Sequence, residues 1–191
     1  MPNETALRCG TCLKKPPHFD RSYVCADYAV PIDQLVTRLK FQAQIGYANL
    51  LGQQLASILA TLAPPDLPDL FCVVPLGRQR LIERGFNQSV EIARCLQRHS
   101  PKAIRLEIDL LRRQRDTAPQ SSLARDLRLK NVRDAFVPHP QQFTLLRDAH
   151  VGIIDDVLTT GATLNEIARV CKRYGAKRVS NFVYARTPAS V

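Results

Sequence analysis

Apolar and polar positions along the chain predict strands that alternate with helices. Apolar runs without polar alternation, typical of strands buried on both faces, occupy 70–75 and 151–154. Further strands are expected at 104–108, from 135–137 and at 179–184. Apolar residues at helical spacing predict helices over 31–41, about 45–62, 87–99 and 164–174, with Gly175 as a C-terminal cap. This order predicts an α/β fold with a doubly wound parallel sheet flanked by helices.

Two segments carry no clear pattern. Residues 1–25 show little apolar periodicity, and no strand or helix is predicted there. Residues 111–133 are rich in arginine and non-periodic, so we expect a mobile loop with some helix.

The stretch 151–163 contains the side chains that most clearly indicate a binding site. Asp155 and Asp156 follow where the strand is expected to end, and a loop rich in Thr and Gly leads into the next helix. Backbone N–H groups and hydroxyls at a helix N-terminus suit a phosphate dianion. Two adjacent carboxylates suit the vicinal hydroxyls of a ribose, because both accept hydrogen bonds. The alternative is an ordinary strand–turn–helix in which the acids and threonines only cap the helix.

Composition limits the class of protein. The 191 residues are about one domain, and 45% hydrophobic residues is typical of a globular protein. No apolar run is long enough to span a bilayer and the first residues do not resemble a signal peptide, so we expect a cytoplasmic location. Cys72, Cys95 and Cys171 fall within apolar patterns and are expected to be reduced core residues.

The net charge of +10 indicates a polyanionic ligand without identifying it. Positive potential attracts the phosphates of a small substrate and those of nucleic acid alike. The arginines gather at 78–84, 112–115 and 125–133, in segments expected to surround the phosphate site.

The stretch 151–163 resembles the phosphoribosyl diphosphate (PRPP) signature of type I phosphoribosyltransferases: four hydrophobics, two acids, then Thr-Gly-x-Thr. Together with Arg-Gly-Phe-Asn-Gln at 84–88, Cys-Gly-Thr-Cys at 9–12 and Leu-Lys-Phe at 39–41, it resembles the ComF family of competence protein F, ComFC and GntX-type proteins. The resemblance covers nearly the whole chain. It implies an N-terminal segment over 1–30 with a partial zinc-ribbon-like knuckle and a phosphoribosyltransferase-like domain over 31–191. Within that domain it implies a helical hood over 31–65 and a core over 68–191.

The resemblance also assigns roles. It implies that Asp155 and Asp156 hold the ribose hydroxyls of PRPP, with Mg²⁺ bridging those hydroxyls and the pyrophosphate. The 5′-phosphate would then be bound by the loop, made of Val157, Leu158, Thr159, Thr160, Gly161, Ala162 and Thr163.

A second loop is expected beside the first. In parallel sheets ligands sit beyond the carboxyl ends of the strands, so the loop after Val74 should face the loop after Ile154. By resemblance the 75–88 loop binds pyrophosphate, through Arg78, Arg80 and backbone amides at Leu76 and Gly77, and Arg115 belongs to a loop that closes over the substrate. The alternative is that Arg78, Arg80 and Arg84 are solvated helix residues near a turn, and that Arg115 lies in a solvated basic loop.

Two departures from the family pattern matter. Cys9 and Cys12 form one knuckle and supply two ligands, whereas a structural zinc site takes four; Cys25 and His18 complete a site only on paper. Purine-using relatives carry an Asp where this chain has Thr159, so a purine acceptor is disfavoured.

The resemblance leaves three functions open. The first is Mg²⁺-dependent transfer of phosphoribosyl from PRPP to a nitrogen nucleophile, linked to competence and DNA uptake. The second is a non-catalytic nucleotide or single-stranded DNA binding protein in natural transformation, with competence helicase or recombination proteins as partners; the low aromatic content of 6% weakens this. A PRPP-binding regulator ranks last. A homodimer is compatible with all three.

Overall fold

A four-stranded parallel sheet forms the centre of the computed structural model, which describes residues 10–115 and 132–188. Its strands lie in the order β1 (Arg21–Asp27), β6 (Arg178–Arg186), β5 (His150–Leu158) and β2 (Leu70–Val73). Every neighbouring pair is parallel. A separate antiparallel pair joins β3 (Leu111–Arg113) to β4 (Phe136–Pro138). The predicted α/β fold is confirmed.

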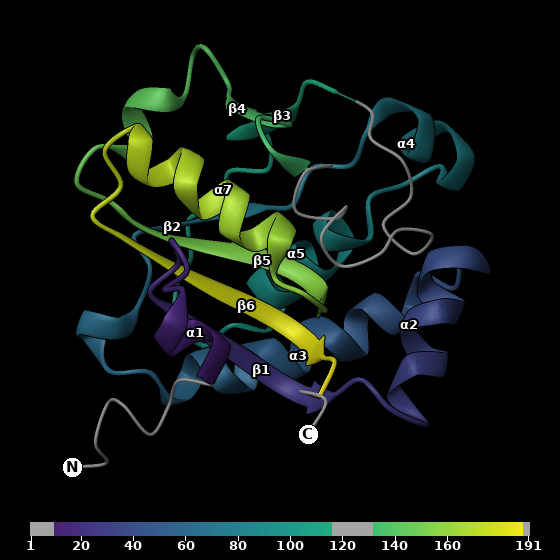
Figure 1. The fold of residues 1–191 in the computed structure, drawn as a ribbon. Coiled ribbons are helices and arrows are strands. Elements are labelled where there is room, and N and C mark those ends of the chain that lie inside the picture. The colour runs from purple at the N-terminus through teal and green to yellow at the C-terminus, as the bar shows by residue number, and fades with distance from the viewer. Residues whose placement is uncertain (1–9, 116–131, 189–191) are drawn as a thin grey trace.

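Helices cover both faces of the sheet (Figure 1). One face carries α2 (Ile32–Phe41), α3 (Gly46–Thr61) and α5 (Gln88–His99), and the other carries α7 (Ala162–Arg173) and the β3–β4 pair. Ile153 and Ile154, neighbours on β5, belong to the two different hydrophobic clusters on these faces. Burial on both sides is why this strand needs no polar alternation. Helices α2 and α3 share their cluster with the sheet residues Phe71 and Phe182.

Close packing of α3 against α5 fixes the position of the helical layer. A Cβ added at Gly52 would lie 2.5 Å from Cβ of Cys95 and 2.7 Å from the backbone nitrogen of Leu96. The two helices can approach this closely only because residue 52 has no side chain.

The four predicted helices are confirmed to within a few residues, whereas several other expectations are corrected. Residues 104–108 form no strand: a single bridge joins Leu106 to Phe71 at the edge of the sheet. The segment 111–133 begins with strand β3 in place of the expected loop, and 116–131 lie outside the described residues. Four short elements were not predicted: α1 (Gly10–Lys14), β1 and the 3-10 turns Pro64–Asp66 and Phe143–Leu146. Helix α4 (Arg78–Arg84) corresponds to the helical alternative for that segment.

None of the helices in 10–115 and 132–188 has the length and apolar character that crossing a membrane requires.

Candidate functional site

The acidic pair lies within β5, which continues to Leu158 and does not end at Ile154 as expected. Parallel pairing with β6 carries the strand on, with Asp155 opposite Val183 and Val157 opposite Ala185. Both acids are covered: Asp155 is 9% exposed and Asp156 is 3% exposed. The expectation that they stand open at the tip of the strand is therefore corrected. Charged and polar side chains from other elements meet them there.

Lys40, in the last turn of α2, forms an ion pair with the carboxylate of Asp156. Burial alone would raise the pKa of Asp156, but the Lys40 ammonium outweighs burial and holds that pKa below its usual value. Asp156 therefore stays ionised. The pair links the hood helix directly to the strand that carries the acids.

Asp155 has a different partner and a different charge state. The hydroxyl of Ser89, in the first turn of α5, donates to Oδ1 of Asp155 over 2.9 Å. Burial and the negative charge of Asp156 raise the pKa of Asp155 to about 7. Two adjacent carboxylates thus differ in ionisation near neutral pH, because Lys40 forms its ion pair with Asp156 and acts on Asp155 only from a greater distance.

The loop behind the acids has the geometry expected of a helix N-terminal turn. Gly161 adopts the left-handed conformation with φ 75°, and α7 begins at the next residue. Thr159 is exposed, whereas Ala162 is buried. The hydroxyl of Thr160 accepts a long bond of 3.4 Å from the backbone nitrogen of Ala162. Helix capping by a threonine, the alternative from the sequence, is thus partly realised, and the α7 N-terminus lies directly behind the acidic pair.

The segment after β2 runs beside the acids, as expected. The backbone nitrogen of Val74 donates to the carbonyl of Ile154 over 3.1 Å, and the Asn87 side chain donates back to the carbonyl of Val74 over 3.0 Å. Leu76 is half-buried and Gly77 precedes the first residue of α4. The segment after Val74 thus lies beside β5 as expected, but Ile154 is followed by further strand and not by the expected loop.

The arginines of this segment lie on α4, as in the alternative prediction that they are helix residues near a turn. Arg78 is exposed and Arg80 is half-buried, and neither forms a hydrogen bond or ion pair with Asp155 or Asp156. Arg84 is closer: its guanidinium lies 5.4 Å from the ring centroid of Phe41 and donates to the side chain of Gln88. Burial lowers the pKa of Arg84, and the charges of Asp156 and Asp155 oppose that effect.

Arg115 is exposed at the end of a described segment, and its guanidinium donates to the carbonyl of Arg133. No hydrogen bond or ion pair joins it to the acids. The rest of the expected closing loop, 116–131, and Cys9 lie outside the described residues.

The zinc expectation stays a prediction. Within 10–115 and 132–188 no three His, Cys, Asp or Glu side chains gather as metal ligands would. Cys25 lies on β1, and burial raises its pKa to about 12, so its thiol is poorly suited to form a thiolate ligand.

Sequence reasoning did not identify Lys40 and Ser89 as the side chains that contact the acids. Both follow or fall within the quoted motifs, since Lys40 is the centre of Leu-Lys-Phe and Ser89 comes directly after Arg-Gly-Phe-Asn-Gln. The motifs marked these segments, but only the fold shows which side chains reach the acids.

Comparisons with known proteins show what the chain is similar to. The family described as phosphoribosyl transferase domain matches residues 84–191. The chain is 37% identical over 187 residues to the DNA utilization protein YhgH of Escherichia coli K12, covering 95% of this chain and 78% of that protein. It is 31% identical to Competence protein F of Haemophilus influenzae, covering 95% and 79%. A solved purine phosphoribosyltransferase from Pyrococcus horikoshii aligns with 19% identity and a TM-score of 0.38, covering 77% and 84%.

Proposed function

Because the chain belongs to the phosphoribosyl transferase domain family, in the branch that contains competence protein F, we propose that it binds PRPP and transfers its phosphoribosyl group to a nitrogen nucleophile. A cytoplasmic location is part of this proposal. In the reaction the nitrogen would attack C1 of the ribose as the bond from C1 to the pyrophosphate oxygen breaks.

The observation that carries the proposal is the joint position of the acids and the loop. Asp155 and Asp156 lie in the second half of β5, and the turn through Gly161 leads from the end of this strand to the N-terminus of α7. Carboxylates would hold the ribose diol while backbone N–H groups of the helix N-terminus hold the 5′-phosphate. Holding the sugar at both ends orients C1 for attack.

Positively charged side chains near the acids support a role in stabilising the departing pyrophosphate. Lys40 is paired with Asp156, and Arg84 is close enough for both acids to influence its pKa. Arg78 and Arg80 lie on the same short helix as Arg84. Positive charges placed before the reaction stabilise negative charge that develops on the leaving group.

The residues also fit Mg²⁺. Asp155 and Asp156 offer the hard oxygen ligands that this ion takes, directly or through water. When bound with PRPP, Mg²⁺ would neutralise charge on the diphosphate. Lys40 pairs with Oδ2 of Asp156, and the other carboxylate oxygen and the remaining lone pairs would be available to a ribose hydroxyl or to Mg²⁺.

The proposal is tested by isothermal titration of PRPP with Mg²⁺ into the protein and into the Asp155→Asn, Asp156→Asn double variant. We expect the double variant to bind at least about a hundredfold more weakly, because carboxyl groups that would bind the ribose hydroxyls and Mg²⁺ are lost at two positions. Asp109→Asn, a change at an exposed aspartate outside the site, is the matched control. Equal affinity of the double variant and the control would contradict the assignment.

Turnover needs a separate measurement. Pyrophosphate release from PRPP and Mg²⁺ is followed with a panel of nucleobases, amines and glutamine as acceptors. Release that depends on an acceptor supports transfer. Binding without release from any acceptor would support a ligand-sensing protein with the same site.

A second candidate function is binding of single-stranded DNA. The net charge of +10 and the relatives named for DNA utilization and competence favour it. Binding to a labelled oligonucleotide should then weaken steeply with salt and be unchanged in the Asp155→Asn, Asp156→Asn variant. Salt-insensitive or absent oligonucleotide binding would argue against this function.

A further inference from the structure

Strand β1 is an open edge of the sheet. Within residues 10–115 and 132–188 its one neighbour in the sheet is β6, and the backbone nitrogen of Asp20 donates to the carbonyl of Val179 over 2.8 Å. Backbone groups alternate in direction along a strand, so Ser22 and Val24 also face β6, whereas the N–H and C=O groups of Tyr23 and Cys25 face outward. An unpaired edge of this kind is a template for another strand.

The centre of β1 lacks the features that usually protect an edge. Natural edge strands carry lysine, proline or a bulge that prevents pairing. Residues 22–26 are Ser-Tyr-Val-Cys-Ala, without charge and without proline. The charged side chains of β1 stand at its two ends, Arg21 at the start and Asp27 at the finish.

Helix α3, which lies beside this edge, is also uncharged on its outer side. None of its 16 residues is acidic or basic, although 23% of the whole chain is charged. Its exposed residues include Gln53, Gln54, Ser57 and Ala60. Depletion of charge on an exposed surface is a feature of protein interfaces and not of an ordinary solvated helix.

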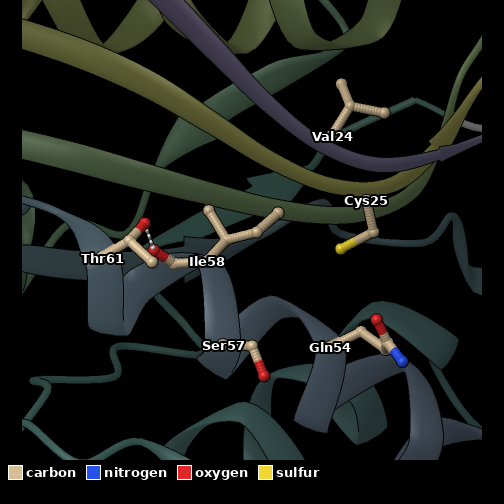
Figure 2. A pocket seen from close by; sticks show the side chains of 6 residues that line it. All are labelled: Val24, Cys25, Gln54, Ser57, Ile58 and Thr61. Carbon is tan, nitrogen blue, oxygen red and sulfur yellow. Dashed lines mark hydrogen bonds between the residues drawn. The ribbon is translucent and has the colours of Figure 1, made fainter.

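A groove separates the strand from the helix. It has a volume of about 320 Å³ and is lined by Val24, Cys25, Gln54, Ser57, Ile58 and Thr61. In Figure 2 the Cys25 side chain points from β1 toward the labelled side chains of α3, whereas the Val24 side chain points away from the helix. The hydroxyl of Thr61 donates to the carbonyl of Ile58, and that of Ser57 donates to Gln53, so both hydroxyls are satisfied by their own helix. The groove thus offers an uncharged surface next to unpaired backbone groups.

We propose that two copies of the chain associate through their β1 strands, paired antiparallel about a two-fold axis at Val24. In this register Arg21 of each copy lies opposite Asp27 of the other. Arg21 is 39% exposed and lies 3.4 Å from Asp66, and Asp27 is 63% exposed and lies 3.6 Å from Arg186. Exposed ion pairs of this kind contribute little, so exchanging them for pairs between the two copies costs little. The strand is therefore complementary in charge to itself when reversed.

The backbone pattern fits the same register. Pairing about Val24 sets the outward groups of Tyr23 opposite those of Cys25 in the second copy, which is the hydrogen-bonded pair of an antiparallel ladder. Val24, whose backbone groups face β6, becomes the non-hydrogen-bonded pair on the axis. The two sheets then join into one sheet of eight strands, since each contributes four.

The two-fold symmetry also determines where the two α3 helices lie. The two-fold axis of an antiparallel strand pair is perpendicular to the sheet, so the α3 helices of both copies lie on the same face, next to each other. Their uncharged surfaces would then cover the two grooves. A second copy explains the open edge and the uncharged helix together, whereas an unrelated charged partner would leave the uncharged helix unexplained.

Charge reversal at the ends of β1 tests the register. Sedimentation velocity over a dilution series should give the wild-type chain a mass near twice 21.4 kDa at high concentration. Arg21→Asp alone and Asp27→Arg alone each place like charges opposite one another and should weaken the dimer by at least about tenfold. The double variant Arg21→Asp, Asp27→Arg restores opposite charges and should recover most of the dimer affinity.

A second variant tests the helix surface without touching the strand. Gln54→Lys adds a charge to the exposed side of α3 in both copies and should also weaken the dimer by about tenfold. Gln141→Lys, at an exposed glutamine in the loop before Phe143–Leu146, is the matched control and should leave the dimer unchanged. A wild-type chain that stays monomeric at every concentration overturns the proposal. So does a dimer that tolerates both single charge reversals and Gln54→Lys.

Discussion

Lys40 and Asp156 form an ion pair that joins the hood helix α2 to the strand of the acidic pair. The Asp156 side chain keeps 4% of its surface exposed and that of Lys40 keeps 22%, so water screens the pair poorly. The same carboxylate is the proposed ligand of the ribose. One contact therefore joins the fold to the candidate site.

The Lys40→Met variant, which keeps the length of the side chain but removes its charge, should be less stable by about 3 kcal/mol. A buried carboxylate that loses its cation keeps its desolvation penalty without compensation. Urea unfolding at neutral pH measures the loss. The Lys40→Met, Asp156→Asn double variant is the control, because it removes both charges and should recover much of the stability. If the double variant is as unstable as the sum of both single variants, the two side chains do not interact.

The stability of the protein should fall as pH rises from about 4 to about 7. The pKa of Asp155 is raised from its usual 3.8 to about 7, so the folded protein binds a proton in this range that the unfolded chain releases. Asp155→Asn, whose side-chain oxygen can still accept from Ser89, should remove this fall. At about pH 8 it should raise the free energy of unfolding by up to about 4 kcal/mol.

Denaturant unfolding of both proteins at a series of pH values checks this difference. Burial lowers the pKa of His150, so this group makes stability rise with pH, opposite to Asp155. Both proteins contain His150, so its effect cancels when their unfolding free energies are compared. Parallel curves for the two proteins would show that Asp155 does not titrate in this range.

Gly161→Ala should destabilise the protein by about 1–2 kcal/mol and weaken PRPP binding. The left-handed φ of 75° at this position is strained for any residue with a Cβ. The turn would shift and with it the N–H groups at the start of α7. Thermal unfolding and calorimetric titration measure the two effects. Gly161→Asn should lose less stability, because asparagine tolerates this conformation better than alanine. Equal losses would indicate that the side chain, not the backbone, disturbs the turn.

Gly52→Ala should cost about 2–4 kcal/mol. Its Cβ would lie 2.5 Å from that of Cys95 and 2.8 Å from the carbonyl of Ile92, so α3 and α5 would have to move apart. Gly46→Ala in the same helix is the control, since a Cβ there meets no atom within 4 Å. The control should be stabilised by about 0.5–1 kcal/mol through helix propensity. Urea unfolding distinguishes a packing effect from a propensity effect, because the two variants should change in opposite directions.

The main helices and the strands β2, β5 and β6 were predicted from the sequence because each buries a continuous apolar run or stripe. Strand β1 was missed, since an edge strand is half-buried and its residues Arg-Ser-Tyr-Val-Cys-Ala-Asp show no strong pattern. The strand expected at 104–108 was wrong, because it pairs with the sheet only through Leu106. For α4 the sequence predicts a loop, with a helix as the alternative, since its seven residues bury no apolar face.

The sequence by itself determined the fold class and the order of acids, loop and helix after β5, because apolar periodicity and local turn chemistry act between near neighbours in the chain. It also indicated that the loops after Val74 and Ile154 meet. Tertiary structure alone decided that Lys40 and Ser89 reach the acids, that Asp155 and Asp156 differ in pKa, and that β1 lies at an open edge. These properties depend on distances between segments far apart in the sequence, and on the burial that those segments impose on one another.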